Sequence, residues 1–142
     1  MKHHIIIDSG HANGTGARGN GQEEHNLCVK VANHLATALR SKGHKVTGID
    51  FPTLSNAADL NATIRRANEL DDVSLGISLH MDASGNASAR GGHVCYISTA
   101  GYIAAKAIAS ELCDYMPGRA QETVKRTNLA VLKRTKWRWV LI

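Results

Sequence analysis

The sequence predicts a single α/β domain of residues 1–142, in which a mostly parallel sheet carries helices on both faces. Two observations lead to this prediction. Short apolar runs rich in β-branched residues alternate with segments whose apolar residues recur every three or four positions. A length of 142 residues also suits one domain, and it is enough to bury a core without disulfide bonds.

The elements are expected in strand–helix order. Ile5, Ile6 and Ile7 mark a buried first strand, and Leu27 opens a four-residue apolar repeat that predicts an amphipathic helix ending before Gly43. Helices are expected over about 24–41, 60–70 and 103–112. The predicted strands are His3–Asp8, Lys45–Asp50, Val73–Leu79, Gly92–Ser98, Leu129–Leu132 and Val140–Ile142.

Composition excludes several classes of protein. No apolar run approaches the roughly 20 residues that span a bilayer, so we expect no membrane partner. The three cysteines, Cys28, Cys95 and Cys113, are odd in number and lie in apolar surroundings, which predicts buried free thiols. The net charge of +5 suits nucleic acid, anionic lipid or a teichoic-acid-bearing wall equally, and the basic residues cluster towards the C-terminus.

Three side chains are expected to meet at one edge of the sheet. His11 follows the first strand and His80 follows the third, so both lie at the carboxyl edge, where parallel sheets bind ligands. Glu24 stands in the first turn of the helix that returns from that edge. Each residue alone has an ordinary structural interpretation, such as a loop histidine or a helix-dipole partner. Together, two imidazoles and one carboxylate form a three-ligand zinc set that leaves a fourth position open for catalysis.

At these residues the chain resembles the zinc-dependent N-acetylmuramoyl-L-alanine amidases. Asp8-Ser9-Gly10-His11 is similar to the family's D-P-G-H opening, and Glu24 with Ala32 and Leu35 is similar to its E-(x)7-A-x-x-L segment. Ala67-Asn68, followed by the run from Ile77 to Ala83, resembles its A-N and S-[IL]-H-x-N-A blocks. The resemblance covers essentially the whole chain and implies a three-layer fold with about six strands. It also implies one zinc ion per chain, held by His11, Glu24 and His80.

The resemblance implies an activity as well: hydrolysis of the amide between N-acetylmuramic acid and L-alanine in peptidoglycan. Ser9 stands where the family has proline. Asp82 stands where the family has asparagine, and its carboxylate is a candidate hydrogen-bond partner for a metal ligand. The family's general-base glutamate follows a V-L-[IV] strand, so its expected position lies just beyond Ile142. We therefore predict no catalytic base within residues 1–142, with Asp82 and His93 as the nearest substitutes.

Two other functions compete with this one. Gly14-x-Gly16-x-x-Gly19 matches a dinucleotide-binding motif, but it begins six residues past Asp8 and the helix does not open within it. The alternative from another class is a cell-wall-binding module that keeps zinc and is catalytically impaired.

The sequence also predicts where the protein acts and how it reaches that place. The first strand begins almost at Met1, so no signal peptide is expected. We expect a monomer that acts on peptidoglycan at the bacterial cell wall, with no nucleic-acid partner. It would reach the wall after phage-type lysis or as an excised domain of a secreted protein.

Overall fold

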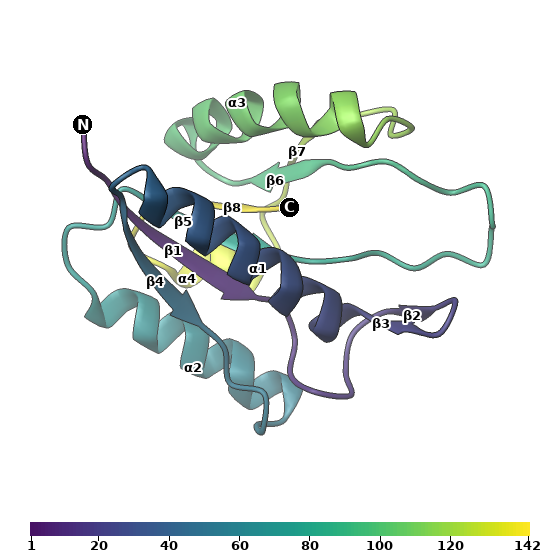
Figure 1. The fold of residues 1–142 in the computed structure, drawn as a ribbon, viewed down its shortest axis with the longest axis horizontal. Coiled ribbons are helices and arrows are strands. Elements are labelled where there is room, and N and C mark those ends of the chain that lie inside the picture. Colours follow the sequence, from purple (N-terminus) through teal and green to yellow (C-terminus); the bar gives the residue numbers. More distant parts are fainter.

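The computed structural model describes residues 1–142, which form one six-stranded sheet between two layers of helices (Figure 1). The strand order is β4-β1-β5-β8-β6-β7. β4, β1, β5 and β8 are mutually parallel, whereas β6 pairs antiparallel with β8 and parallel with β7. The strands of this sheet are β1 (His4–Ser9), β4 (Lys45–Ile49), β5 (Leu75–Leu79), β6 (Val94–Tyr96), β7 (Thr123–Lys125) and β8 (Trp139–Leu141).

The helices cover both faces of the sheet, as the alternating pattern predicts. α1 (Glu24–Ser41) and α3 (Thr99–Tyr115) pack on one face, and α2 (Asn56–Glu69) and α4 (Ala130–Arg134) on the other. In β1, Ile5 and Ile7 face the first pair of helices, and Ile6 faces the second pair. Small buried residues at four-residue spacing let α1 and α3 approach the sheet closely, namely Cys28, Ala32, Ala36, Ala105, Ala109 and Cys113.

Most predicted elements are confirmed, with boundaries shifted by a few residues. The helix expected over 24–41 is α1, and the last predicted strand is β8, one residue earlier than expected. The strand predicted at Leu129–Leu132 is wrong, because Ala130–Arg134 is helical. A short apolar run does not distinguish a strand from a buried helical turn. Here Val131 and Leu132 fill the layer beside α2, where Ala67 is buried, rather than a place in the sheet.

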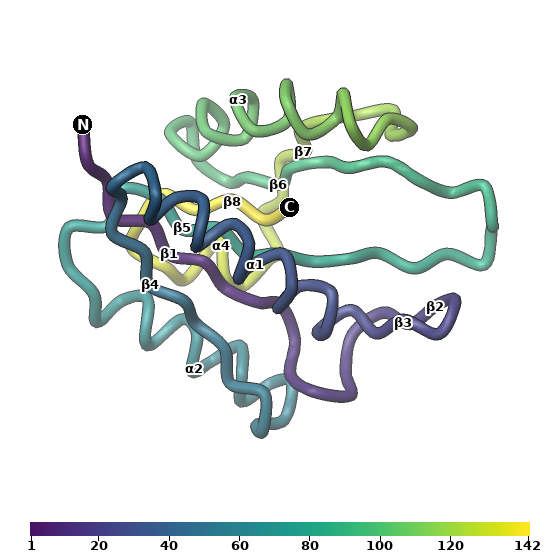
Figure 2. The backbone as a smooth tube through the Cα atoms, in the orientation of Figure 1, coloured from purple at the N-terminus to yellow at the C-terminus, as the bar shows by residue number.

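The two edges of the sheet differ in what they carry. The parallel strands end beside a hairpin, β2 (Arg18–Gly19) with β3 (Gln22–Glu23), and beside the long segment 80–93. Figure 2 shows both segments projecting past the carboxyl edge. The N-terminus lies at the opposite edge, where the strands begin. No helix is both long enough and apolar enough to span a membrane.

Candidate metal centre

His11 stands in the turn that follows β1, in a backbone conformation unusual for its type. Its φ is +64°, in the left-handed region that few non-glycine residues adopt. Gly10 makes the turn possible, because a Cβ there would lie 2.3 Å from the Leu79 carbonyl oxygen and 2.6 Å from the His80 ring. The backbone N–H of Gly10 donates to that same carbonyl at 2.9 Å. The turn therefore holds His11 against the end of β5.

Glu24 is the first residue of α1, and its carboxylate is buried at 3 % exposure. The backbone N–H of Ala17 donates to its Oε2 at 2.6 Å, and that of Met81 donates to its Oε1 at 2.9 Å. The neighbouring Glu23 points elsewhere, pairing with Arg18 and accepting from the Gly14 N–H. The structure thus selects Glu24 over Glu23 for the interior position, as the spacing predicts.

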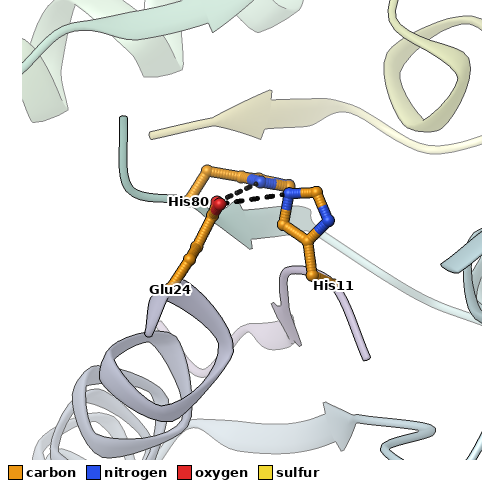
Figure 3. A group of neighbouring side chains, drawn as sticks. All are labelled: His11, Glu24 and His80. Carbon is orange, nitrogen blue, oxygen red and sulfur yellow. Dashed lines mark hydrogen bonds and ion pairs between the residues drawn. The ribbon is translucent and has the colours of Figure 1, made fainter. Parts of the chain in front are cut away.

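The three predicted side chains converge, as Figure 3 shows. His80 Nδ1 lies 2.9 Å from Glu24 Oε1, and His11 Nε2 lies 3.3 Å from Glu24 Oε2. One donor atom from each of the three residues falls within 4.8 Å of the others. The two imidazoles meet edge to face, with ring centroids 5.0 Å apart.

The electrostatics of Glu24 suit a cation. Burial acts to raise its pKa, but hydrogen bonds from His80 and the backbone N–H groups of Ala17 and Met81 outweigh burial and lower the pKa to about 2. The carboxylate is therefore ionised at neutral pH although it is buried. A buried anion between two imidazole nitrogens, close to solvent, has the donor chemistry that Zn²⁺ takes in catalytic sites.

Two contributors to this centre were not found from the sequence. Asn56, at the start of α2, accepts a hydrogen bond from His11 Nδ1–H at 2.8 Å, which leaves Nε2 as the lone-pair nitrogen of a neutral ring. Gly16 packs directly against the site: a Cβ on this residue would lie 2.6 Å from Glu24 Oε2 and 2.9 Å from the His11 ring. Asn56 is 45 residues from His11 in the chain, and no spacing pattern connects them.

Asp8 links the strands and the helix that carry the candidate centre. Its buried carboxylate accepts hydrogen bonds from Ser78 Oγ at 2.5 Å and from Thr63 Oγ1 at 3.2 Å, tying β1 to β5 and α2. Burial raises its pKa, and the hydrogen bonds from Ser78 oppose this rise. The carboxylate positions the two strands that end at His11 and His80.

The other residues considered from the sequence lie outside the centre. Asp82 pairs with Arg119 rather than with a metal ligand. His93 precedes β6, and burial together with Arg119 lowers its pKa. His25 is buried, and its Nδ1 lies 3.3 Å from the Gly10 carbonyl oxygen. All three cysteines are free and buried, which confirms that prediction.

A groove opens directly beside Glu24. Its cavity has a volume of about 530 Å³ and lies between the β2–β3 hairpin and the segment 81–89. Glu24 and Met81 form its inner end, and Arg18, Asn20 and Asn86 contribute polar side chains along its walls. Residues of the loop between His11 and Glu24 thus form one wall of a groove that reaches Glu24.

Comparison with known proteins agrees with this geometry. The family model for N-acetylmuramoyl-L-alanine amidase matches residues 5–142. Among solved structures, the catalytic domain of the CD27L endolysin targeting Clostridia difficile is 28 % identical, with a TM-score of 0.88, covering 98 % of this chain and 79 % of that one. No curated protein sequence matches.

Two further structures share the fold at lower identity. CwlV from Bacillus (Paenibacillus) polymyxa var. colistinus is 19 % identical, with a TM-score of 0.81, covering 99 % of this chain and 78 % of that one. Ami1 from Mycobacterium smegmatis is 18 % identical, with a TM-score of 0.83, covering 98 % of this chain and 80 % of that one.

The fold and the extent of the family match define the class of protein, an amidase catalytic domain. The chain belongs to the N-acetylmuramoyl-L-alanine amidase family. It is accordingly a hydrolase of peptidoglycan, and its reaction breaks the amide between N-acetylmuramic acid and L-alanine.

Proposed function

We propose that this chain is a zinc-dependent N-acetylmuramoyl-L-alanine amidase in which His11, Glu24 and His80 hold one zinc ion. One observation carries the proposal: donor atoms of the three residues lie within 4.8 Å of one another around a buried, ionised carboxylate. When bound, zinc would polarise the scissile carbonyl and lower the pKa of a water molecule towards ~7. Asn56 would keep the ring of His11 in the tautomer that offers Nε2.

The groove beside Glu24 is the proposed binding site for the muropeptide. Of the three proposed metal ligands, Glu24 lines this groove, so a stem bound in it would bring its first amide beside the proposed centre. We propose that the chain works as a monomer at the cell wall, since every residue of the proposed centre comes from one chain.

The general base is the part of the mechanism that residues 1–142 do not supply in this proposal. Asp82 is paired with Arg119, and Asp8 is buried within β1 and hydrogen-bonded to Ser78 and Thr63, so neither carboxylate is free to take a proton from water. The Ile142 carbonyl accepts from the His80 N–H at 2.8 Å, and the Ile142 N–H donates to Ser78 at 2.9 Å. A residue joined after Ile142 would therefore lie next to His80 at the carboxyl edge.

A carboxylate at that position would take a proton from the attacking water and pass it to the leaving amine. General-base catalysis contributes typically 10²–10⁴-fold to a rate. We expect the 142-residue chain to hydrolyse muropeptide slowly, and the same chain extended by Glu-Cys-Gly-Phe to be faster by about that factor. An extension by Gln-Cys-Gly-Phe is the matched control. Full activity without any extension would instead assign the base to another group, with His93 the first candidate.

Metal analysis tests the zinc site independently of turnover. Purified protein should carry about one zinc per chain, and His80→Ala should lose it because one of three protein ligands is gone. His34→Ala is the control, since His34 is exposed on the outer side of α1. Equal zinc in all three proteins would contradict the assignment.

A further inference from the structure

A second cavity lies at the amino edge of the sheet, opposite the metal centre. Its volume is about 680 Å³, and it is formed where β5 and β8 begin, where α3 begins, and by the segment that links α4 to β8. None of its lining residues belongs to the groove at the carboxyl edge. We propose that this cavity is a binding site for a phosphate group carried on a sugar or polyol.

The charge of the lining is positive. His3, Lys136 and Arg138 contribute cationic or protonatable groups, and no carboxylate lines the cavity. Lys136 makes one long contact of 3.8 Å with Asp71, whose side chain is 89 % exposed, so this pair holds Lys136 weakly. The Arg138 side chain makes no ion pair. Both cations are therefore available to an anionic ligand.

Hydroxyl groups and a helix terminus add donors. The hydroxyls of Ser74 and Ser98 line the cavity, and His3 Nδ1 lies 3.3 Å from Ser74 Oγ. Thr135 also lines it, but its hydroxyl already donates to the Val131 carbonyl at 2.6 Å. Ser98 is the N-cap of the 17-residue helix α3, and Ala100 in its first turn also lines the cavity. Ser98 Oγ already accepts from the Gly101 N–H at 3.0 Å, so the N–H groups of Thr99 and Ala100 are the ones without an intrahelical acceptor. Their partial positive charge favours phosphate over a neutral ligand.

Two tryptophans give the cavity a rigid apolar wall. Trp137 Nε1 donates to the Ala67 carbonyl at 3.0 Å, which anchors its ring, and Lys136 Nζ lies 4.7 Å from that ring's centroid. Trp139 is 2 % exposed and packs over Gly76, where a Cβ would lie 2.1 Å from the ring. Trp139 therefore supports the floor of the cavity, and the half-buried ring of Trp137 is the aromatic surface open to a ligand. An aromatic surface beside a cation suits a ligand that joins a carbon skeleton to an anion. The volume exceeds what a lone phosphate ion fills.

The expected source of this ligand rests on the proposed function. A peptidoglycan amidase works among wall polymers, and those built from polyols linked by phosphodiesters present this chemistry in many copies. Binding at the amino edge would hold the domain on the wall while the carboxyl edge stays free for muropeptide. Soluble phosphate esters share the same chemistry and are separated by the experiment.

Intrinsic fluorescence reports on this cavity specifically, because the chain's two tryptophans both line it. Chelator-treated protein is titrated with glycerol 3-phosphate, so the result does not depend on the zinc site. We expect a saturable change that weakens as salt rises. Lys136→Gln with Arg138→Gln should weaken binding about tenfold or more, because charge-assisted hydrogen bonds are lost. The matched control is Lys30→Gln with Arg65→Gln, which removes the same charge from exposed positions on α1 and α2.

A sedimentation assay identifies the source. Retention on insoluble wall should fall when its phosphodiester polymers are removed by hydrofluoric acid, and the Lys136/Arg138 double variant should show lower retention on untreated wall. Unchanged retention together with glycerol phosphate binding keeps the site and assigns it to soluble esters. The proposal is overturned if fluorescence shows no saturable change, if both double variants bind equally, or if an oligonucleotide binds as tightly through the same residues. Hydrolysis of a soluble muropeptide by the extended chain, equal in both double variants, shows separately that the amidase function stands.

Discussion

The two edges of one sheet carry opposite electrostatics. At the carboxyl edge, the ionised Glu24 is buried between two imidazoles and two backbone N–H groups, an arrangement that calls for a cation. At the amino edge, Lys136 and Arg138 line a cavity that no carboxylate lines, and this arrangement favours the binding of an anion. Parallel pairing separates these regions, because all parallel strands begin at one edge and end at the other.

The edges also differ in how they are built. The carboxyl edge is tightly constrained: His11 has a positive φ, and Gly10 and Gly16 leave no room for a side chain. Such constraint is typical of sites whose side chains must be held in place for chemistry. At the amino edge, the exposed cations Lys136 and Arg138 line a cavity whose lining has no residue with a positive φ, which suits attachment better than catalysis. Substitutions at the two edges should therefore have separable effects.

Removal of the Glu24 charge should give the largest effect. Glu24→Gln takes away the only anion of the proposed ligand set, and we expect loss of zinc and a fall in the extended chain's activity of about 10³-fold or more. Glu23→Gln is a control one residue away, since Glu23 contacts Gly14 and Arg18 instead. Similar losses from both variants would mean that the hairpin, rather than the ligand, is being disturbed.

A smaller effect is expected at the hydrogen-bond partner of His11. Asn56→Ala removes the acceptor for Nδ1–H, and outer partners of this kind typically contribute 10–100-fold to metal affinity. Competition with a chromogenic zinc chelator measures the change. Asn61→Ala on the same helix should bind zinc normally, because Asn61 bonds only Arg134. Unaltered zinc affinity in Asn56→Ala would show that Asn56 does not orient the His11 ring for metal binding.

The next largest effect on zinc affinity is expected at Gly16, which packs against Glu24 and His11. Gly16→Ala places a methyl group at a φ of +86° and against both Glu24 and His11, so we expect zinc affinity to fall about tenfold. Gly19→Ala is the matched substitution in the same loop, where a Cβ meets nothing within 4 Å. Equal affinities in the two variants would show that the loop relaxes freely.

The last expected effect concerns the stability of the fold rather than zinc affinity. Burial, with the charges of Asp8 and Asp50, raises the pKa of Asp59 from 3.8 to about 6. The folded state therefore holds this proton more tightly than the unfolded state, and stability falls as pH rises between those two values. Asp59→Asn should be more stable than the natural chain above that range, by at most about 3 kcal/mol, and similar below it.

Urea unfolding on both sides of that pH range measures the difference. Asp114→Asn, at an exposed position on α3, should leave the pH dependence unchanged. A natural chain that gains stability as pH rises through this range would contradict the assignment to Asp59.

The residues of the candidate metal centre could be predicted from the sequence because two of them follow the ends of predicted strands. Strand periodicity placed His11 and His80 at one edge, and helix periodicity placed Glu24 in the first turn of α1. Asn56 was missed because its contact with His11 depends on how the loop before α2 folds back. The cavity at the amino edge was missed for a similar reason: His3, Ser74 and Arg138 precede three different strands and share no motif. The basic tail was visible, but its relation to α3 was not.

The most direct test of the zinc centre is crystallographic. Crystals of the chain grown with zinc should show an anomalous difference peak about 2.0–2.2 Å from a nitrogen of His11, a nitrogen of His80 and an oxygen of Glu24 at once. The same peak should be absent from Glu24→Gln and present in Glu23→Gln. A zinc peak that contacts only one of the three residues, or that lies elsewhere in the molecule, would contradict the account.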